Sequence, residues 1–338
     1  MAVADTPRIA ILGAGSVGCF VGGCWQAAGL PVTFIGRESI GQDIAAHGLT
    51  LSDSLGWETH LSDVDYRTDA SALAQADVIA VTVKSGTTEQ AAREIAAHGR
   101  RGALVISFQN GISNLDVLRN ELGDWVQVVR GMVPFNVAYL GGGHFHKGVA
   151  GKLYADDLPA TRALSEAVGK GPAALALSKD MAGMAWGKLL INLNNAVNAL
   201  SGMPLLEQLR EHDYRRVVAA SQREGLRLLK RAGIRPAKVG LLPPPLLPLA
   251  IGSPDWLFNA VFLKAWKIDE RARSSMADDL AAGRKTEVDY INGELVALGE
   301  RLGVDAPINR AIVRLVRWAE TGAKPWAPAA LRRDVLGS

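Results

Sequence analysis

The sequence predicts an α/β protein of two domains, in which a half with alternating strands and helices is followed by an all-helical half. Four compact apolar runs separated by helical stretches lie within the first 111 residues. From about residue 180, long helical patterns replace this alternation. Apolar strands that alternate with helices are typical of a parallel sheet covered on both faces. We therefore place the domains at residues 1–179 and 180–338.

The individual elements follow from apolar periodicity and turn residues. Strands are expected at residues 8–13, 31–36, 77–84 and 102–111, and a hairpin at residues 49–62. Helices of the first half are expected from the end of the first strand to about Ala28, and at residues 39–47 and 87–98. Helices of the second half are expected at residues 180–200, 212–232, 255–268, 273–282, 287–302 and 307–320. The apolar run at 241–252 contains prolines that exclude a regular helix.

Composition and charge argue against several classes of partner: nucleic acid, a metal ion at the cysteines, and a membrane. The chain has 338 residues, 48% of them hydrophobic, and a net charge of +3 without any block of five basic residues, which argues against nucleic acid as a partner. Cys19 and Cys24 are predicted to be core residues of a reducing compartment, and their spacing predicts no metal site. No cleavable signal and no apolar run of about 18 residues is present, so we expect a cytoplasmic protein without a membrane partner.

The segment "GAGSVG" follows the first predicted strand and opens a helix. In the pattern G-x-G-x-x-G, Gly13 permits a tight turn, Gly15 lets a pyrophosphate approach the backbone, and Gly18 lets helix and strand pack closely. The predicted dinucleotide-binding loop comprises Gly13, Ala14, Gly15, Ser16, Val17 and Gly18. The alternative is a glycine-rich turn with packing duties alone.

The end of the second predicted strand indicates which dinucleotide is bound. Sites that prefer NAD place Asp or Glu there, whereas this strand ends in Gly36 and Arg37. Because a guanidinium suits a 2′-phosphate, NADP(H) is favoured. The alternative is a surface arginine at a strand end.

Two further predicted strands end in polar residues, Lys84 and the sequence Gln109-Asn110-Gly111. Ligands of open parallel sheets lie beyond the carboxyl ends of strands, so Lys84 and Asn110 are candidate ligand contacts. The alternatives are a solvated lysine and a common Asn-Gly turn.

The predicted helix "AWGKLLINLNNAVNALSG" (185–202) carries Lys188, Asn192 and Asn195 on one face of an otherwise apolar run. Solvated helix faces usually carry pairs of opposite charge, and this stripe has no acidic residue. An ammonium among neutral amides is typical of a lining for a polar ligand. A solvent-facing stripe remains the alternative.

A late segment has two capping signals. Thr286 and Asp289 are spaced as a variant of the capping box, which leaves Glu287 in the first helical turn, where the helix dipole favours a carboxylate. Ser274 and Ser275 are both candidates to cap the preceding helix. Each residue therefore has a structural explanation.

Taken together, these motifs resemble the ketopantoate reductases (2-dehydropantoate 2-reductases) along the whole chain. The resemblance is carried by "GAGSVG", Arg37, "VTVKS", "FQNG", "WGKLLINLNN", "SSM" and "TEVDYING", in this order. It implies an N-terminal Rossmann domain, a helical domain like that of 6-phosphogluconate dehydrogenases, and NADPH as hydride donor to a 2-oxo acid. It also implies roles for particular residues: Lys188 as the catalytic lysine, Asn110, Asn192 and Ser275 as substrate contacts, and Lys84 and Glu287 near cofactor and substrate, with Glu287 assigned to catalysis as well.

Two departures from the family pattern bear on the substrate. Asn195, the remaining candidate substrate contact, follows Asn192 by three residues where the family often has four, and the proline-rich stretch 241–254 looks longer than the corresponding connection. We therefore expect reduction of ketopantoate to pantoate, with another branched 2-oxo acid as the alternative substrate. A non-catalytic NADPH-sensing regulator is the alternative from another class. The sequence leaves open whether the chain forms a homodimer.

Overall fold

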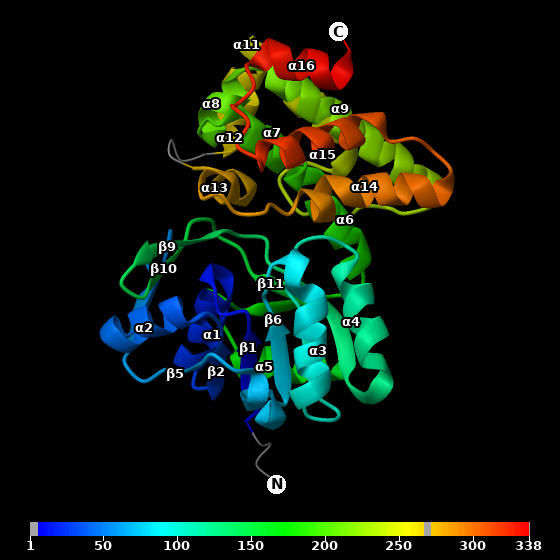
Figure 1. The fold of residues 1–338 in the computed structure, drawn as a ribbon. Coiled ribbons are helices and arrows are strands. Elements are labelled where there is room, and N and C mark those ends of the chain that lie inside the picture. Colours follow the sequence, from blue (N-terminus) through cyan, green and yellow to red (C-terminus); the bar gives the residue numbers. More distant parts are fainter. Residues whose placement is uncertain (1–5, 267–271, 338) are drawn as a thin grey trace. The chain divides into compact units, whose positions relative to one another are not determined.

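A computed structural model describes residues 6–266 and 272–337 of the chain. The chain forms two compact units, Met1–Met181 and Ala182–Ser338 (Figure 1). Each unit is described by itself below.

The first unit contains an eight-stranded sheet in the order β12-β11-β8-β7-β6-β1-β2-β5. All neighbouring strands are parallel except β8 and β11. The strands are β1 (Ile9–Leu12), β2 (Val32–Ile35), β5 (Asp65–Arg67), β6 (Val78–Val81), β7 (Leu104–Ser107), β8 (Gln127–Met132), β11 (Leu153–Asp156) and β12 (Leu175–Ser178). The predicted parallel sheet is confirmed, but its four predicted strands are shorter than expected. Their polar ends belong to the loops that follow.

Helices cover both faces of this sheet (Figure 1). The core on one face includes side chains of α1 (Ser16–Ala27), α2 (Glu38–His47) and α5 (Pro159–Val168). The core on the other face includes side chains of α3 (Thr88–His98) and α4 (Asn114–Leu122). Cys19 and Cys24 are buried free thiols in the first of these cores. Burial raises the pKa of both thiols, which makes them unreactive.

A second, four-stranded sheet has the order β4-β3-β10-β9. Its strands are β3 (Leu49–Asp53), β4 (Glu58–Leu61), β9 (Val137–Gly141) and β10 (His144–Lys147). Strands β3 and β4 form the predicted antiparallel hairpin, whereas the parallel pairing of β10 with β3 joins segments about 90 residues apart, which local patterns do not predict. This sheet packs on α1 where Gly23 leaves room for Leu49 and Leu51.

The second unit is helical, as predicted. Its helices are α6 (Met181–Asn192), α7 (Asn194–Ser201), α8 (Leu205–Arg210), α9 (His212–Arg231), α10 (Leu247–Ile251), α11 (Asp255–Leu257), α12 (Lys264–Trp266), α13 (Ser275–Ala281), α14 (Val288–Leu302), α15 (Pro307–Ala319) and α16 (Pro328–Leu336). The long helix α9 contacts α7, α8, α10, α14, α15 and α16, and so forms the centre of the unit.

Three expectations for this unit were wrong in detail. The predicted helix at 180–200 is interrupted at Leu193, within a run of asparagines, which are poor helix formers. The predicted helix at 255–268 is divided by a π-helical segment, Phe258–Leu263, and its last two residues lie outside the described part of the chain. The prolines do not exclude a helix from 241–252, because Pro248 lies in the first turn of α10, where its missing N–H costs nothing.

Among the described residues, no single helix is long and apolar enough to cross a membrane. One sharply bent pair of segments, Pro244–Ile251 and Asp255–Leu263, meets the criteria of length and composition only when the two are taken together.

Candidate functional site

The loops that follow four neighbouring strands of the large sheet carry the candidate residues of the first unit. Strands β7, β6, β1 and β2 are adjacent and parallel, so their carboxyl ends lie along one edge. Along this edge come Asn110 after β7, Lys84 after β6, the glycine loop after β1 and Arg37 after β2. With strands about 4.8 Å apart, this row spans roughly 15 Å. The sequence placed these residues at strand ends, and the strand order places them in one row.

The glycine loop has the geometry that each of its three glycines permits. Gly13 adopts a φ of 100°, and a Cβ there would lie 2.4 Å from the backbone nitrogen of Val83. At Gly18 a Cβ would lie 2.7 Å from the carbonyl oxygen of Gly13 and 2.6 Å from Oγ1 of Thr82, so only glycine lets α1 approach β1 this closely. At Gly15 the nearest atom to a Cβ is 4.0 Å away, which leaves open space above the loop.

The start of α1 suits an anion. The first turn of a helix leaves N–H groups without intrahelical partners, and no side chain caps the N-terminus of α1, which begins at Ser16. The amides of Gly13 and Ala14 differ, because both donate to the carbonyl oxygen of Ile35, and Ala14 is buried. The Gly15 amide donates to the carbonyl oxygen of Gly13 (2.7 Å), so the open space over Gly15 and the uncapped helix fit a pyrophosphate held by the amides of residues 16–18.

Arg37 is exposed at the end of β2, where it is the N-cap residue of α2. Gly36 precedes it in a crowded position, since a Cβ there would lie 2.4 Å from the hydroxyl oxygen of Tyr66 and 3.0 Å from the Cβ of Ala14. From the sequence, Gly36 is explained by the absence of an acidic side chain that would repel a 2′-phosphate. The structure adds a packing reason.

A buried polar cluster ties together the loops that carry Lys84 and Asn110. Asn114 Nδ2 donates to Oγ of Ser85 (3.0 Å), and the Asn114 amide also bonds the carbonyl oxygen of Asn110. Oγ1 of Thr88 donates to Asn114 Oδ1 (2.8 Å) and accepts from Gln109 Nε2 (2.8 Å). Asn114 and Thr88 escaped the sequence analysis because a single buried amide or hydroxyl within a helix has no distinctive pattern. Their bonds fix the two loops relative to each other.

In the second unit, Lys188 and Asn192 lie on α6, one turn apart, and Asn195 lies in the first turn of α7. All three are half-buried, so the stripe is not a fully solvated face. Asn194, beside the interruption at Leu193, has a buried Oδ1 without a hydrogen-bond partner among the described residues. Buried polar atoms are nearly always bonded to protein, water or ligand, so this oxygen indicates a position for a further polar group.

Electrostatics single out Lys188. Burial lowers the pKa of its ammonium from 10.5 to about 8, and the nearby carboxylate of Glu287 acts in the opposite direction. An ammonium with a pKa near neutrality can donate a proton to a substrate and recover it from water. The structure thus brings Lys188 and Glu287 into one electrostatic environment although 99 positions separate them.

The surroundings of Glu287 differ from the predicted capping box. Helix α14 begins at Val288, so Glu287 is its N-cap residue and does not lie in the first turn. Oγ1 of Thr286 accepts from the Val288 amide (3.3 Å) and donates to Glu320 (2.7 Å). Asp289 forms an ion pair with Arg317 (2.8 Å) and closes no capping box. The Glu287 carboxylate is therefore not used as a helix cap.

Of the two serines that could cap α13, one is the cap and the other is exposed. Ser274 caps α13, because its Oγ accepts from the Ala277 amide (3.2 Å), whereas Ser275 is exposed in the first turn. The Ser274 amide donates to Oδ1 of Asn198 (2.9 Å), and its Oγ donates to the carbonyl oxygen of Asn195 (3.2 Å). These bonds attach α13 to α7 and hold Ser275 close to the asparagine-rich turn.

A second cluster of buried polar side chains links α6, α9, α14 and α15 by hydrogen bonds. Gln222 on α9 donates to the carbonyl oxygen of Leu190 (3.1 Å), two residues beyond Lys188. Asn309 on α15 accepts from Asn292 of α14 (2.9 Å) and donates to Glu224 of α9 (2.9 Å). These bonds join α6 directly to α9, and they join α14 to α9 through α15. Sequence patterns gave no signal for them.

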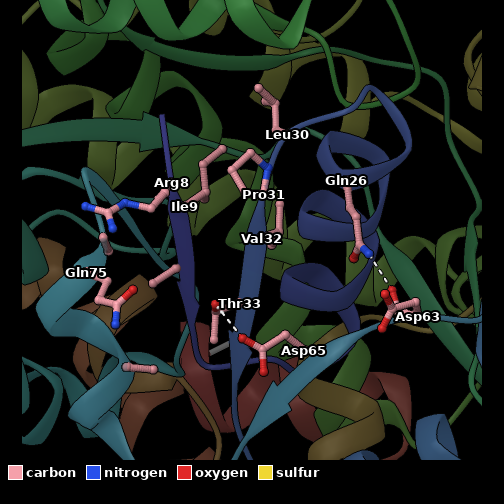
Figure 2. Close-up of a pocket in the computed structure, with 13 residues that line it drawn as sticks. Arg8, Ile9, Gln26, Leu30, Pro31, Val32, Thr33, Asp63, Asp65 and Gln75 are labelled. Atoms are coloured by element: carbon pink, nitrogen blue, oxygen red, sulfur yellow. Dashed lines mark hydrogen bonds between the residues drawn. The ribbon is translucent and has the colours of Figure 1, made fainter. Parts of the chain in front are cut away.

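Among the described residues, no group of three or more His, Cys, Asp or Glu side chains is arranged to hold a metal ion. A pocket of the first unit is lined in part by Ile9 and Val32, the first residues of β1 and β2, and by Gln26 and Asp63 (Figure 2). It lies at the amino ends of these strands, the edge opposite to the glycine loop.

Comparison with known families gives matches over both units. A family described as "Ketopantoate reductase PanE/ApbA" matches residues 9–160, and one described as "Ketopantoate reductase PanE/ApbA C terminal" matches residues 180–320. The 2-dehydropantoate 2-reductases of Archaeoglobus fulgidus and Halobacterium salinarum are 29% and 26% identical over 326 and 327 residues. The matches cover 93% of this chain in both cases, and 98% and 99% of the relatives.

Solved structures agree with these matches. A PanE/ApbA family ketopantoate reductase from Ralstonia eutropha JMP134 has a TM-score of 0.80 and 29% identity, covering 93% of this chain and 99% of that one. A D-mandelate dehydrogenase solved with NADH and anilino(oxo)acetate has the same fold, with a TM-score of 0.77, 20% identity, and coverage of 93% and 99%.

Proposed function

Since the chain belongs to the ketopantoate reductase family, we propose that it reduces a branched 2-oxo acid, ketopantoate, with NADPH as hydride donor. Family membership makes the protein an oxidoreductase that acts on a CH–OH group, which sets aside the alternative of a non-catalytic regulator. In this proposal, residues 1–179 bind the cofactor and residues 180–338 bind and protonate the substrate.

The row of loops at the sheet edge supports the cofactor assignment. The open backbone at Gly15 and the uncapped start of α1 suit the pyrophosphate, and Arg37 suits a 2′-phosphate. Lys84 and Asn110 then lie toward the nicotinamide end, because they follow β6 and β7 on the other side of the glycine loop. Bound NADPH would supply a hydride to C2 of the substrate. Lys84 and Asn110 would orient the groups next to that carbon.

The observation that carries the proposal is the lowered pKa of Lys188 on a helix face of neutral amides, with Glu287 nearby. Lys188 donates a hydrogen bond to the ketone oxygen and then its proton, which stabilises the charge that develops on that oxygen. Asn192, Asn195 and Ser275 offer hydrogen bonds to the substrate carboxylate and hydroxyl without neutralising the ammonium. Glu287 keeps the ammonium protonated near neutral pH.

The choice of ketopantoate is tested with a panel of 2-oxo acids. We expect a higher kcat/KM for ketopantoate than for 2-oxoisovalerate, which lacks the hydroxyl, because a site built to bond a hydroxyl discriminates against analogues without one. NADPH oxidation with ketopantoate, 2-oxoisovalerate, pyruvate and benzoylformate measures this preference. Equal or better reduction of 2-oxoisovalerate would assign the protein to another branched 2-oxo acid.

A further inference from the structure

Tyr66 is a residue of the first unit that no sequence motif singled out. It lies in the middle of β5, the edge strand beside β2. Its hydroxyl, which has a single proton to donate, lies within hydrogen-bond distance of two acceptors, the carbonyl oxygens of Arg37 (3.0 Å) and Ala14 (3.2 Å). One side chain therefore joins the glycine loop to the loop that carries the arginine.

The surrounding chain leaves space for this ring. A Cβ at Gly36 would lie 2.4 Å from the Tyr66 hydroxyl oxygen, and a Cβ at Gly41 would lie 2.7 Å from its ring. Gly41 lies inside α2, where glycine is less favourable than alanine, so the ring fills a space that the sequence keeps open at a cost. The Phe34 ring stacks with the Tyr66 ring, and the angle between the two ring planes is 4°.

The hydrogen bond from Tyr66 to Arg37 is made to the backbone carbonyl oxygen of the arginine. The carbonyl oxygen of Arg37 also accepts from the amides of Ile40 and Gly41, in the first turn of α2. Tyr66 thus fixes the backbone of Arg37 from the side of the glycine loop. A long side chain with a fixed backbone has fewer orientations to lose when it binds an anion.

We propose that Tyr66 is a positioning residue for recognition of the 2′-phosphate, acting through Arg37. This inference rests on the proposed NADPH dependence. Tyr66 sets the distance between the pyrophosphate loop and the arginine, and so contributes to the preference for a cofactor with a 2′-phosphate over one without it.

The test uses the full-length protein and two probes, adenosine 2′,5′-bisphosphate and 5′-AMP, which differ only in the 2′-phosphate. We expect the Tyr66→Phe substitution to raise the Kd of the bisphosphate about fivefold, in keeping with the loss of one or two neutral hydrogen bonds. The Kd of 5′-AMP should rise less than about twofold. Calorimetric titration measures both values. Tyr139→Phe is the matched control. It also removes a phenol hydroxyl that bonds α2, but the partner is the Asp43 side chain and not the Arg37 backbone. Both Kd values should stay unchanged in this control.

Equal changes for the two probes, or no change for either, would overturn the role of Tyr66. If Tyr66→Phe does not fold, Gly41→Ala provides a second test, because its methyl would lie 2.7 Å from the Tyr66 ring and so displace the phenol, while the nearest atoms it meets all belong to that ring. Failure of the proposed cofactor gives a different result. In that case the wild type binds both probes equally, and Arg37→Ala changes neither Kd.

Discussion

Lys188 is the residue on which the proposed chemistry depends. Lys188 is half-buried as a residue on α6, and its neighbours along the helix face are amides that cannot accept its proton. We expect Lys188→Ala to lower kcat by about 10²–10⁴-fold, the usual contribution of a general acid, while the Kd of NADPH stays nearly unchanged. Single-turnover kinetics and cofactor titration measure the two effects separately. A variant that keeps more than about a tenth of the wild-type kcat would remove Lys188 from the catalytic role.

The pKa of Lys188 predicts the pH dependence of reduction. The ammonium must be protonated to act as an acid, so kcat/KM should be level below about pH 7 and fall tenfold per pH unit above about 8. The carboxylate of Glu287 raises this pKa, and Glu287→Gln should therefore shift the falling limb to lower pH. A limb that moves to higher pH in the variant, or does not move, would contradict the coupling of the two groups.

At the scale of elements, Gly15 and Gly18 at the start of α1 have different roles, since Gly15 faces open space and Gly18 is packed against its neighbours. Gly15→Ala places a methyl in open space where the pyrophosphate should lie, so we expect a Kd for NADPH at least about tenfold higher and an unchanged melting temperature. Gly18→Ala places a methyl against backbone and Ile11, and overpacking of this kind costs about 1–3 kcal/mol of unfolding free energy. Titration and thermal unfolding of both variants distinguish binding from packing. The reverse pattern would exclude the proposed path of the cofactor.

The interruption between α6 and α7 is also a property of an element. A continuous helix would keep Lys188, Asn192 and Asn195 on one face at about 100° per residue. At the interruption, Leu193 keeps helical backbone angles (φ −58°, ψ −24°) and its amide donates to the carbonyl oxygen of Leu189 (3.1 Å), while Ser274 bonds the carbonyl oxygen of Asn195. The spacing of three residues between Asn192 and Asn195 therefore still places both on neighbouring positions of a helical face.

At the scale of the whole molecule, the two units should respond differently to cofactor. Asn309→Ala removes the buried amide that links α9, α14 and α15, and should lower the unfolding free energy by about 2–4 kcal/mol. Saturation with NADPH at a hundred times its Kd stabilises the folded protein by about 2.7 kcal/mol. Because the proposed cofactor groups lie in the first unit, we expect Asn309→Ala to keep this increment and Gly15→Ala, with its tenfold higher Kd, to keep about 1.4 kcal/mol of it or less at the same NADPH concentration. Differential scanning calorimetry with and without NADPH measures both, and loss of the increment in Asn309→Ala would assign cofactor binding to the second unit as well.

The sequence by itself determined the fold class and the local parts of the site. Apolar runs and glycine spacing are local signals, so the parallel sheet, the glycine loop, Arg37 and the helix of Lys188 could all be read from it. Short or edge elements such as β5 and α10 were missed, because three to five residues carry too little periodicity to be distinguished from a loop. The prolines of residues 241–252 suggested no helix for a related reason, since their effect depends on the turn in which they lie.

Only the tertiary structure decided which distant groups meet. Tyr66 reaches Arg37 and Ala14 because β5 pairs with β2, and Glu287 raises the pKa of Lys188 although 99 positions separate the two residues. The roles of Ser274 and Ser275 were likewise separated by a bond to Asn198, 76 positions earlier. Such contacts form between segments far apart in the chain, and their free energy depends on burial and geometry that no local pattern encodes. The same burial lowers the pKa of Lys188, which turns an ordinary lysine into a group able to donate a proton near neutral pH.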